Sequence, residues 1–507
     1  MVKVACGICC LALSRQLPGR VFGPGDSEYS HSLASYYSAQ GAATYPSCIV
    51  SPLTTLEVST AVQVLSTGGG DAAKSLPACK FAIRSGGHAT FAGASNIDGG
   101  VTIDLSGLTG IELLSAPTPL SLAPGTTPPP IVSVGVGSRW GSVYDYLDDL
   151  HLSVNGGRAA GVGVAGLTLG GGISYFGPRF GWTCDTVKNY EVVLGNGTIV
   201  NANDNENANL LWALRGGGNN IGIVTRIDLE TFPQEELWGG QVVTMFDTVD
   251  EQIAALAAFN DPGTYDEFAS LITTFAYSAD LGIQVVVNNM EYTKPVEDPP
   301  VFHPLLSIPA LTSTQRIANI TDLTRETEAN NPNGLRHSTW LTASWGYRQG
   351  SATLTIQSTV PAIKATVDAW EASLPSIQGI PGLLWGLGMD PLPPQLYAVH
   401  SDSSALGLTN RNDTALIVIH LTMTWLNAAD DNIIDEAAKA LVTAIKRETG
   451  ALDALDPYIY VNYAAPWQRP IESYGQESVE RLRRVRSEYD PAGVFTNLVS
   501  GGFKIPG

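Results

Sequence analysis

Lys80-Phe-Ala-Ile-Arg84 runs directly into Ser85-Gly-Gly-His88, and this stretch decides the fold of the first half of the chain. Alternating apolar residues over 80–84 predict a strand. Two glycines after a strand let backbone N–H groups converge on an anion such as a diphosphate, because a chain without Cβ atoms bends tightly. His88 at the rim of such a loop would meet the ligand, and imidazole is a nucleophile near neutral pH. In isolation, Gly-Gly-His more often marks a glycine turn with a hydrogen-bonded histidine, so the motif depends on its context.

The sequence around this loop predicts alternating strands and helices. Cys48-Ile-Val50 is a short apolar strand, and Pro52 opens a helix that ends at Gly68-Gly-Gly70. Asn196-Gly197 between two apolar runs predicts a tight hairpin. The other expected elements of this half are strands 101–105, 131–136, 190–194, 198–200 and 222–229, a helix at 207–214, and a Pro-rich loop from Pro117 to Pro130.

A length of 507 residues with 44% hydrophobic content predicts two domains. We expect a first domain over 45–235, a second over 236–455, and a C-terminal segment, 456–507, that returns to the first. Glycine becomes sparser in the second domain, where apolar runs alternate with helical patterns, so a mainly antiparallel α+β unit is expected. Its clearest elements are strands 283–287, 339–345 and 416–425 and a helix at 433–448.

Charge and hydropathy exclude several classes of partner. With 28 Lys plus Arg against 48 Asp plus Glu, the net charge of −20 repels nucleic acid and anionic lipid. No apolar run reaches the roughly 18 residues that cross a bilayer, so neither nucleic acid nor a membrane is expected as a partner.

The N-terminal residues have the outline of a secretory signal. Met1 to Leu13 carries one early cation and a short apolar stretch, so residues 1–20 are a possible signal peptide. We therefore expect a secreted protein, with a cytoplasmic location as the alternative. Cys48 and Cys79 flank the first predicted helix and could form a disulfide in an oxidising compartment, with Cys184 as a buried thiol. The alternative is three unpaired thiols, and no metal site is expected.

A second glycine-rich block, Gly156 to Tyr175, contains Gly-x-Gly-x-x-Gly at Gly161, Gly163 and Gly166. That pattern alone would indicate a nicotinamide-binding turn. We reject this interpretation because the triple glycine 170–172 disfavours the helix that should follow, and no clear strand precedes the block.

Together these motifs resemble the flavin domain of the vanillyl-alcohol oxidase and p-cresol methylhydroxylase superfamily, in its berberine-bridge-enzyme-like branch. The resemblance rests on Arg84-Ser-Gly-Gly-His88 with Val101-Thr-Ile-Asp-Leu105, the block at 156–175, Trp212 to Thr225, and the C-terminal runs 458–463 and 494–504. It implies an α+β fold: a two-part flavin-binding domain of the p-cresol methylhydroxylase type, and a substrate domain with a mainly antiparallel sheet backed by helices.

The resemblance also implies FAD, bonded covalently to His88. In the family a cysteine early in the second glycine-rich loop makes another covalent bond, but Ala159 stands there, so a single attachment is expected. Ile221 replaces a commoner Phe, and Ala464-Ala465 replaces an acidic residue that relatives often carry. The residues expected to bind the cofactor are Arg84, Ser85, Gly86, Gly87, His88, Ser95, Gly157, Val162, Gly163, Gly166, Gly171, Gly222, Ile223, Val224 and Asn462.

Tyr460 and Tyr463 flank Asn462 and are the expected catalytic residues, because the family places tyrosines of this motif against the substrate. One of them would act as the base, with a pKa lowered by a cation or charged partner from the second domain. If 458–463 is a strand, side chains alternate, and Tyr460 and Tyr463 point to opposite faces.

The expected activity is FAD-dependent oxidation of a small molecule. A hydride would leave an alcohol, amine or activated C–H carbon, most plausibly of a specialised metabolite, and O₂ would accept the electrons and form hydrogen peroxide. The alternatives are oxidation of a carbohydrate at its anomeric carbon and a redox-neutral cyclisation on the same scaffold. We expect a monomer.

Overall fold

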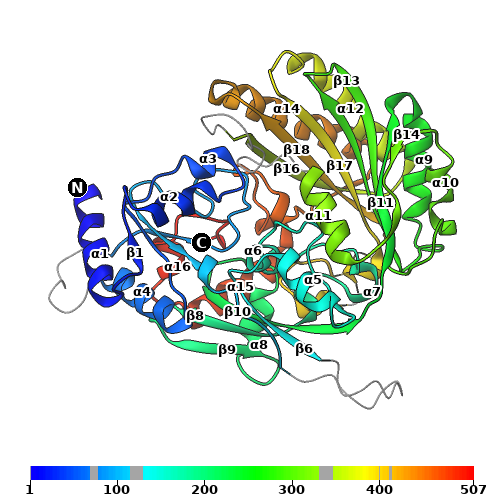
Figure 1. Cartoon of the computed structure of the whole chain (residues 1–507). Coiled ribbons are helices and arrows are strands. Elements are labelled where there is room, and N and C mark those ends of the chain that lie inside the picture. Colours follow the sequence, from blue (N-terminus) through cyan, green and yellow to red (C-terminus); the bar gives the residue numbers. More distant parts are fainter. Residues whose placement is uncertain are drawn as a thin grey trace.

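The computed structural model describes residues 2–68, 78–114, 130–330, 346–398, 400–409, 411 and 414–507, with the backbone alone for 2–6. Figure 1 shows two lobes that meet along a shared boundary. Each lobe has its own hydrophobic core. Part of the expected Pro-rich loop, the expected strand 339–345 and Gly69-Gly70 lie outside the described residues. The fold class agrees with the expectation.

In the described part of the first lobe, strands form one sheet of four strands and one of six. The first has the order β1-β2-β4-β3, with β4 parallel to both β2 and β3. The second has the antiparallel order β5-β6-β10-β8-β9, and β7 pairs with β10. The strands are β1 (Val21–Phe22), β2 (Cys48–Val50), β3 (Phe81–Arg84), β4 (Val101–Asp104), β5 (Ile111–Leu113), β6 (Ile131–Gly135), β7 (Leu152–Val154), β8 (Val187–Leu194), β9 (Ile199–Asn203) and β10 (Gly222–Pro233).

Two helices of this lobe, α4 (Thr55–Thr67) and α8 (Ala208–Leu214), lie where the sequence predicts helices. The first predicted helix ends at Gly68, whose φ of +73° gives the left-handed cap that favours glycine. Gly197, at φ +84°, closes the predicted hairpin between β8 and β9. The helices are α1 (Val2–Gln16), α2 (Ser27–Ala34), α3 (Ala39–Ala42), α4 (Thr55–Thr67), α5 (Trp140–Asp148), α6 (Val164–Leu169), α7 (Gly177–Phe180), α8 (Ala208–Leu214), α15 (Gln476–Tyr489) and α16 (Val494–Asn497).

The second lobe is built on an antiparallel sheet, nine-stranded in the described residues, with the order β14-β11-β13-β12-β17-β18-β16-β19 and β15 on β11. Its strands are β11 (Leu237–Met245), β12 (Ala269–Ser278), β13 (Ile283–Tyr292), β14 (Ala310–Ser313), β15 (Arg316–Ala318), β16 (Arg348–Gln357), β17 (Leu384–Leu392), β18 (Leu416–Trp425) and β19 (Leu455–Asp456).

The two faces of this sheet differ in character. Met290, Met389 and Ile419 belong to the second core on the outer face, which α9, α12 and α14 cover in Figure 1. Because side chains alternate along a strand, the next residue on each strand points toward the first lobe. The helices are α9 (Val249–Phe259), α10 (His303–Leu306), α11 (Ile320–Asn330), α12 (Val360–Ser373), α13 (Pro394–Tyr397) and α14 (Asp431–Ala451).

The C-terminal segment packs on the first lobe, and its start corrects one expectation. Residues 458–463 do not form a strand: the chain is irregular and then takes a 3₁₀ turn at Val461–Tyr463. Further along, the Phe81 N–H donates to the Leu498 carbonyl at 2.9 Å, and Leu482 of α15 is buried in the first core. The segment thus completes the lobe that contains His88.

The disulfides differ from the expected pair. Cys48 and Cys79 are not bonded to each other; Cys10 bonds to Cys48, and Cys9 bonds to Cys79. The expectation was wrong because it set the N-terminal cysteines aside with the possible signal, whereas α1 packs against α4 and brings them to the sheet. Removal of residues 1–20 would eliminate both disulfides. Cys184 is a buried free thiol, as predicted.

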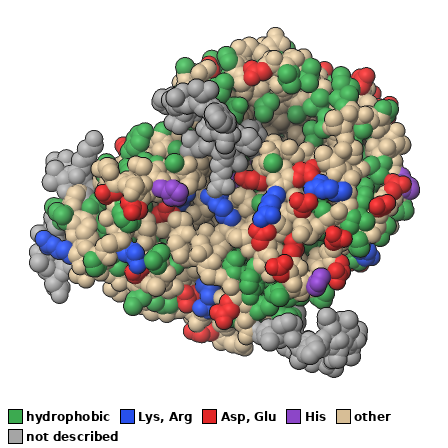
Figure 2. All heavy atoms as spheres, viewed as in Figure 1, with side chains coloured by type: hydrophobic (Ala, Val, Ile, Leu, Met, Phe, Trp, Pro, Cys, Tyr) green, Lys and Arg blue, Asp and Glu red, His purple; other side chains and the backbone are tan. Residues whose placement is uncertain are grey.

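No helix in the described residues is long and apolar enough to cross a membrane. Within the same residues, no group of three or more His, Cys, Asp or Glu side chains is arranged to hold a metal ion. Figure 2 shows acidic and basic side chains interspersed over the face in view. This distribution gives that face no broad basic surface in the described part of the chain.

Candidate active site

The two glycine-rich loops cross each other at the centre of the candidate site. A Cβ on Gly86 would lie 2.5 Å from the Gly163 Cα, and a Cβ on Gly163 would lie 2.6 Å from the Gly86 Cα. Real Cβ atoms do not approach backbone so closely, so the crossing requires glycine on both sides. Ser85 fixes the first of the two loops, since its Oγ donates to the Val136 carbonyl at 2.6 Å.

His88 projects from this crossing and is half-buried. Its imidazole stacks on the ring of Tyr37, with the ring centroids 3.9 Å apart and the planes 13° from parallel. Gly87, at φ +66°, turns the chain just before it. The predicted attachment residue therefore has a defined ring orientation.

Arg84, predicted to bind the cofactor, turns its guanidinium inward. The side chain is 1% exposed, and its Nη1 donates to the Asp104 Oδ2 at 2.9 Å and to the Ser32 carbonyl at 2.8 Å. The guanidinium therefore ties the start of the loop to the N-terminal segment.

The glycines of the second glycine-rich loop have different surroundings. The Gly161 N–H donates to the Glu328 carboxylate of α11 at 3.1 Å. Gly166, in contrast, is exposed, and a Cβ there would meet nothing within 4 Å. Gly171 has a φ of +105° at the end of α6. The loop is thus held by the second lobe at one end and open in its middle.

The other residues predicted to bind the cofactor surround the crossing, and their backbone groups are bonded within the protein. The Gly157 carbonyl accepts from the Tyr144 hydroxyl, and the Ser95 carbonyl accepts from the Tyr36 hydroxyl. The Val162 carbonyl accepts from the Trp140 N–H. Gly222, Ile223 and Val224 begin β10 opposite Leu194, Val193 and Val192, and the next residue, Thr225, accepts from the Val136 N–H beside Ser85.

The C-terminal turn brings Tyr460 and Tyr463 together. The 3₁₀ turn places residues three apart on the same side, so the two rings meet edge to face at 4.8 Å between centroids. The expectation that they point to opposite faces was wrong because it assumed a strand. Asn462 is exposed beside the second loop, and its Nδ2 donates to the Leu167 carbonyl at 3.0 Å and to the Tyr460 hydroxyl at 2.9 Å.

Tyr460 and Tyr463 have different surroundings. Tyr460 is 1% exposed, and its hydroxyl accepts from the Ile173 N–H as well as from Asn462. The Tyr463 hydroxyl accepts from the Arg158 guanidinium at 2.7 Å, and part of its surface remains accessible. Tyr460 is therefore enclosed by the protein, whereas Tyr463 belongs to a surface that a substrate can reach.

Arg158 links that tyrosine to the second lobe. Its Nη1 donates to the Asp390 Oδ1 of β17 at 2.7 Å. Burial opposes the charge on Arg158, but Asp390 and Tyr463 raise its pKa above the ordinary value. Burial raises the pKa of Tyr463 well above its usual range, and Arg158 opposes that rise only in part. The Tyr463 side chain is a neutral phenol here, so the expected lowered pKa is wrong for this structure.

His420 of β18 packs against Tyr463. The two rings stack at 3.6 Å between centroids and 4° from parallel. Ser351 has one hydroxyl proton, which it donates to the Tyr463 carbonyl, so its oxygen accepts from the His420 Nε2 at 2.9 Å. Burial lowers the pKa of His420 to about 4. His420 is thus a neutral imidazole that orients the tyrosine.

Glu291 of β13 is a buried acid on the same face of the sheet. It is 1% exposed, and burial raises its pKa to about 8, while Arg158 and Tyr175 lower it. Its carboxyl group is therefore largely protonated at neutral pH.

Sequence reasoning missed Arg158, Asp390, His420, Glu291, Glu328 and Tyr37. A usable signal existed for two of them: Asp390 is the one ionisable residue of β17, and His420 is the one ionisable residue of β18. A charged or ionisable group in such a run requires a partner or a function.

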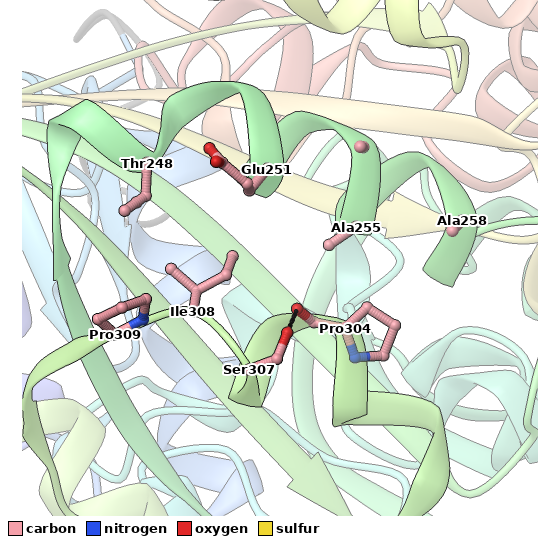
Figure 3. Close-up of a pocket in the computed structure, with 9 residues that line it drawn as sticks. Thr248, Glu251, Ala255, Ala258, Pro304, Ser307, Ile308 and Pro309 are labelled. Atoms are coloured by element: carbon pink, nitrogen blue, oxygen red, sulfur yellow. Dashed lines mark hydrogen bonds between the residues drawn. The ribbon is translucent and has the colours of Figure 1, made fainter.

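A separate surface hollow lies on the outer side of the second lobe (Figure 3). Its volume is about 520 Å³, and it lies between α9 and the 304–309 turn. Its walls are mainly Ala and Pro side chains, with Thr248 and Glu251 near the start of α9. None of the predicted site residues lines it.

Comparison with known proteins gives matches over both lobes. The family described as FAD binding domain matches residues 46–203, and the family described as berberine and berberine like matches residues 459–500.

The FAD-dependent monooxygenase sdcF of Emericella nidulans is 36% identical over 507 residues, which cover 98% of this chain and 98% of that protein. The oligopeptidase PhomG' of Diaporthe leptostromiformis is 39% identical over 493 residues, 96% of this chain, but this chain spans only 36% of that protein. Among solved structures, glucooligosaccharide oxidase from Acremonium strictum has a TM-score of 0.71 at 21% identity, covering 98% of this chain and 99% of that chain.

Proposed function

We propose that this chain, which belongs to the berberine-like family of FAD-linked oxidoreductases, oxidises a small organic metabolite by removing hydride from an alcohol, amine or activated C–H carbon. The observation that carries the proposal is the meeting of three segments at one place. The His88 loop, the second glycine-rich loop and the Tyr463 turn come together against polar side chains of the large sheet.

The residues at this place fit FAD. The crossing of Gly86 and Gly163 brings two glycine-rich backbones together, and Gly166 and Asn462 leave room beside them. Ala159 carries no sulfur, so His88 is the proposed point of covalent attachment, through the 8α position. Glucooligosaccharide oxidase from Acremonium strictum has a 6-S-cysteinyl, 8α-N1-histidyl FAD, and the single attachment proposed here follows from the missing thiol.

Bound FAD would supply a hydride acceptor that is reoxidised by O₂. The protein must then hold the substrate and take the proton of its O–H or N–H group. We assign the proton transfer to Tyr463: its phenol would accept the substrate proton and release its own proton to Asp390, because Arg158 holds both groups. Arg158, bonded to both, keeps the two oxygens in place.

The identity of the relatives favours a metabolite over a sugar. FAD-dependent monooxygenases match this chain at 30–36% identity over nearly its whole length, whereas the oligosaccharide oxidase resembles it at 21% identity. Anomeric oxidation is therefore the second candidate, and redox-neutral cyclisation is the third. We also propose a monomeric state and a secretory location, which the two disulfides favour as long as Cys9 and Cys10 stay on the chain.

Anaerobic reduction tests the proposal. Purified yellow protein is mixed with candidate alcohols, phenols, amines and oligosaccharides in the absence of O₂, and the flavin absorbance is followed. We expect bleaching by a metabolite, and one hydrogen peroxide per substrate after O₂ is admitted. Bleaching by oligosaccharides alone would favour the second candidate. Product formation without bleaching or peroxide would establish the redox-neutral reaction and contradict an oxidase.

A further inference from the structure

The N-terminal segment 27–40 packs directly against the His88 loop, although it precedes the matched FAD binding domain. The buried ion pair between Arg84 and Asp104 anchors it: Ser32 of α2 donates to the same Asp104 oxygen and accepts from Arg84. Removing a partner from a buried pair is costly because a charge remains unpaired. The segment is therefore an integral part of this loop's support.

Two consecutive tyrosines of this segment contact the loop in different ways. The Tyr36 ring lies under the Arg84 guanidinium, 4.2 Å from its Cζ, and the Tyr36 hydroxyl donates to the Ser95 carbonyl. The Tyr37 N–H donates to the Gly87 carbonyl at 3.0 Å, which brings the Tyr37 ring over the imidazole of His88. Tyr36 thus supports the loop, while Tyr37 contacts the reactive residue.

The segment continues into the second lobe. The Ala39 N–H donates to the Tyr347 carbonyl at 3.1 Å, and the Gln40 side chain accepts from the Gln349 N–H at 3.2 Å. Tyr37 is consequently held from both sides, between the loop and the large sheet. These hydrogen bonds fix the backbone around Tyr37, and its ring is stacked on the His88 imidazole.

We infer that Tyr37 is a positioning residue for covalent flavin attachment: its ring, stacked on one face of the His88 imidazole, fixes the plane of that imidazole. A histidine ring rotates over a broad range about its last torsion. The reactive lone pair of an imidazole nitrogen lies in the ring plane, so a partner stacked on the face restricts rotation without covering the nitrogens. The inference rests on the proposed attachment at His88.

The bonds, protons and electrons of the attachment step can be accounted for. A C–N bond forms between an imidazole nitrogen and the 8α carbon, that carbon loses one hydrogen, and the nitrogen loses its proton. The two electrons released pass through the isoalloxazine to O₂, giving one hydrogen peroxide per bond formed. The linked imidazole can carry a positive charge, which an aromatic face stabilises. Tyr37 can therefore act before and after the bond forms.

The test compares the wild type with Tyr37→Phe, Tyr37→Leu and, as a matched control in the same part of the chain, Tyr45→Ala at a side chain that is 60% exposed. Each protein, prepared without flavin, is mixed with FAD in the presence of O₂, samples are precipitated with acid at intervals, and the flavin in the pellet and in the supernatant is measured. Since aromatic stacking is worth about 0.5–1.5 kcal/mol, attachment in Tyr37→Leu should be roughly 2- to 10-fold slower. At a time when wild type, Tyr37→Phe and Tyr45→Ala hold most of their flavin in acid-stable form, Tyr37→Leu should still release much of its flavin.

Equal acid-stable flavin in Tyr37→Leu and Tyr37→Phe would overturn the inference and leave the proposed function intact. A Tyr37→Leu protein that melts well below Tyr37→Phe and binds no flavin would assign Tyr37 a packing role and would also overturn it. Wild-type protein that binds FAD but releases all of it in acid would instead refute the covalent attachment on which the inference rests.

Discussion

At the scale of single residues, Tyr463 is distinguished from Tyr460 by what each hydroxyl contacts. The Tyr460 hydroxyl accepts hydrogen bonds from two protein donors, the Ile173 N–H and the Asn462 Nδ2. The Tyr463 hydroxyl instead meets a buried ion pair that spans the two lobes. The proposed proton transfer is therefore assigned to the second arrangement.

Tyr→Phe substitutions separate these two roles. Tyr463→Phe should lower kcat roughly 10²- to 10⁴-fold, the usual contribution of a positioned acid or base, and should also lower the melting temperature, because the buried Arg158 guanidinium loses an acceptor. Tyr460→Phe should leave two donors without their acceptor and cost about 1–3 kcal/mol of stability, with a smaller effect on kcat. Steady-state kinetics and thermal unfolding of both variants check this, and unchanged turnover in Tyr463→Phe would remove it from the proton transfer.

His420 should make stability depend on pH in a defined direction. Its folded pKa is about 4, below the value of about 6.5 in an unfolded chain. Between these two values the unfolded chain binds the extra proton, so stability falls as the pH drops from about 6.5 to 4, by roughly 3 kcal/mol in total. Unfolding of His420→Gln should show a smaller loss over this interval. An identical pH profile in the variant would contradict the assignment.

The sequence could indicate single functional residues only where they stood in a motif. His88, Asn462 and the glycines were predicted because their order along the chain is distinctive. Asp390 and His420 stand alone in apolar strands, and such a signal indicates a constrained residue without identifying its partner. Arg158 lies within the second glycine-rich block, but its side chain bonds to Asp390 and Tyr463, both more than 200 residues away.

At the scale of elements, prediction succeeded where local pattern decides structure. β18 has the expected bounds, Leu416–Trp425, and α14 extends the predicted helix by a few residues at each end. The 458–463 run failed because its bonding partners are distant. The Tyr460 hydroxyl accepts from the Ile173 N–H, and the Asn462 amide donates to the Leu167 carbonyl, so tertiary contacts replace the ladder of a strand.

Within the second glycine-rich loop, two substitutions should behave differently. Gly163→Ala places a Cβ 2.6 Å from the Gly86 backbone, so the loop crossing should be lost and the protein destabilised. Gly166→Ala meets no protein atom and should preserve or slightly raise apoprotein stability, since alanine favours a helix. If FAD lies against Gly166, that variant should nevertheless bind less flavin. Full flavin content in Gly166→Ala would place the cofactor elsewhere.

The disulfides of α1 should contribute measurable stability. The Cys10–Cys48 bond closes a separation of 38 residues, and loss of such a bond typically costs about 2–4 kcal/mol. Cys10→Ser and Cys48→Ser should each lower the melting temperature, and the double variant should cost no more than either single variant. Additive losses would show that the two cysteines act independently and are not bonded to each other.

At the scale of the whole molecule, the site exists only because distant segments meet. The N-terminal segment, both glycine-rich loops, α11, the large sheet and the C-terminal turn each contribute a residue to it. Sequence order could predict that 456–507 returns to the first lobe, but not which face of the large sheet it meets. That relation depends on the packing of two lobes, which no local pattern encodes.

The most direct test of this account is the state of the flavin in the wild type and in His88→Ala. Both proteins are purified from the same host, precipitated with acid and weighed intact by mass spectrometry. We predict that the wild-type pellet stays yellow and carries the added mass of one FAD, while His88→Ala folds but yields a colourless pellet without that mass. A colourless wild-type pellet, or acid-stable flavin in His88→Ala, would contradict the account.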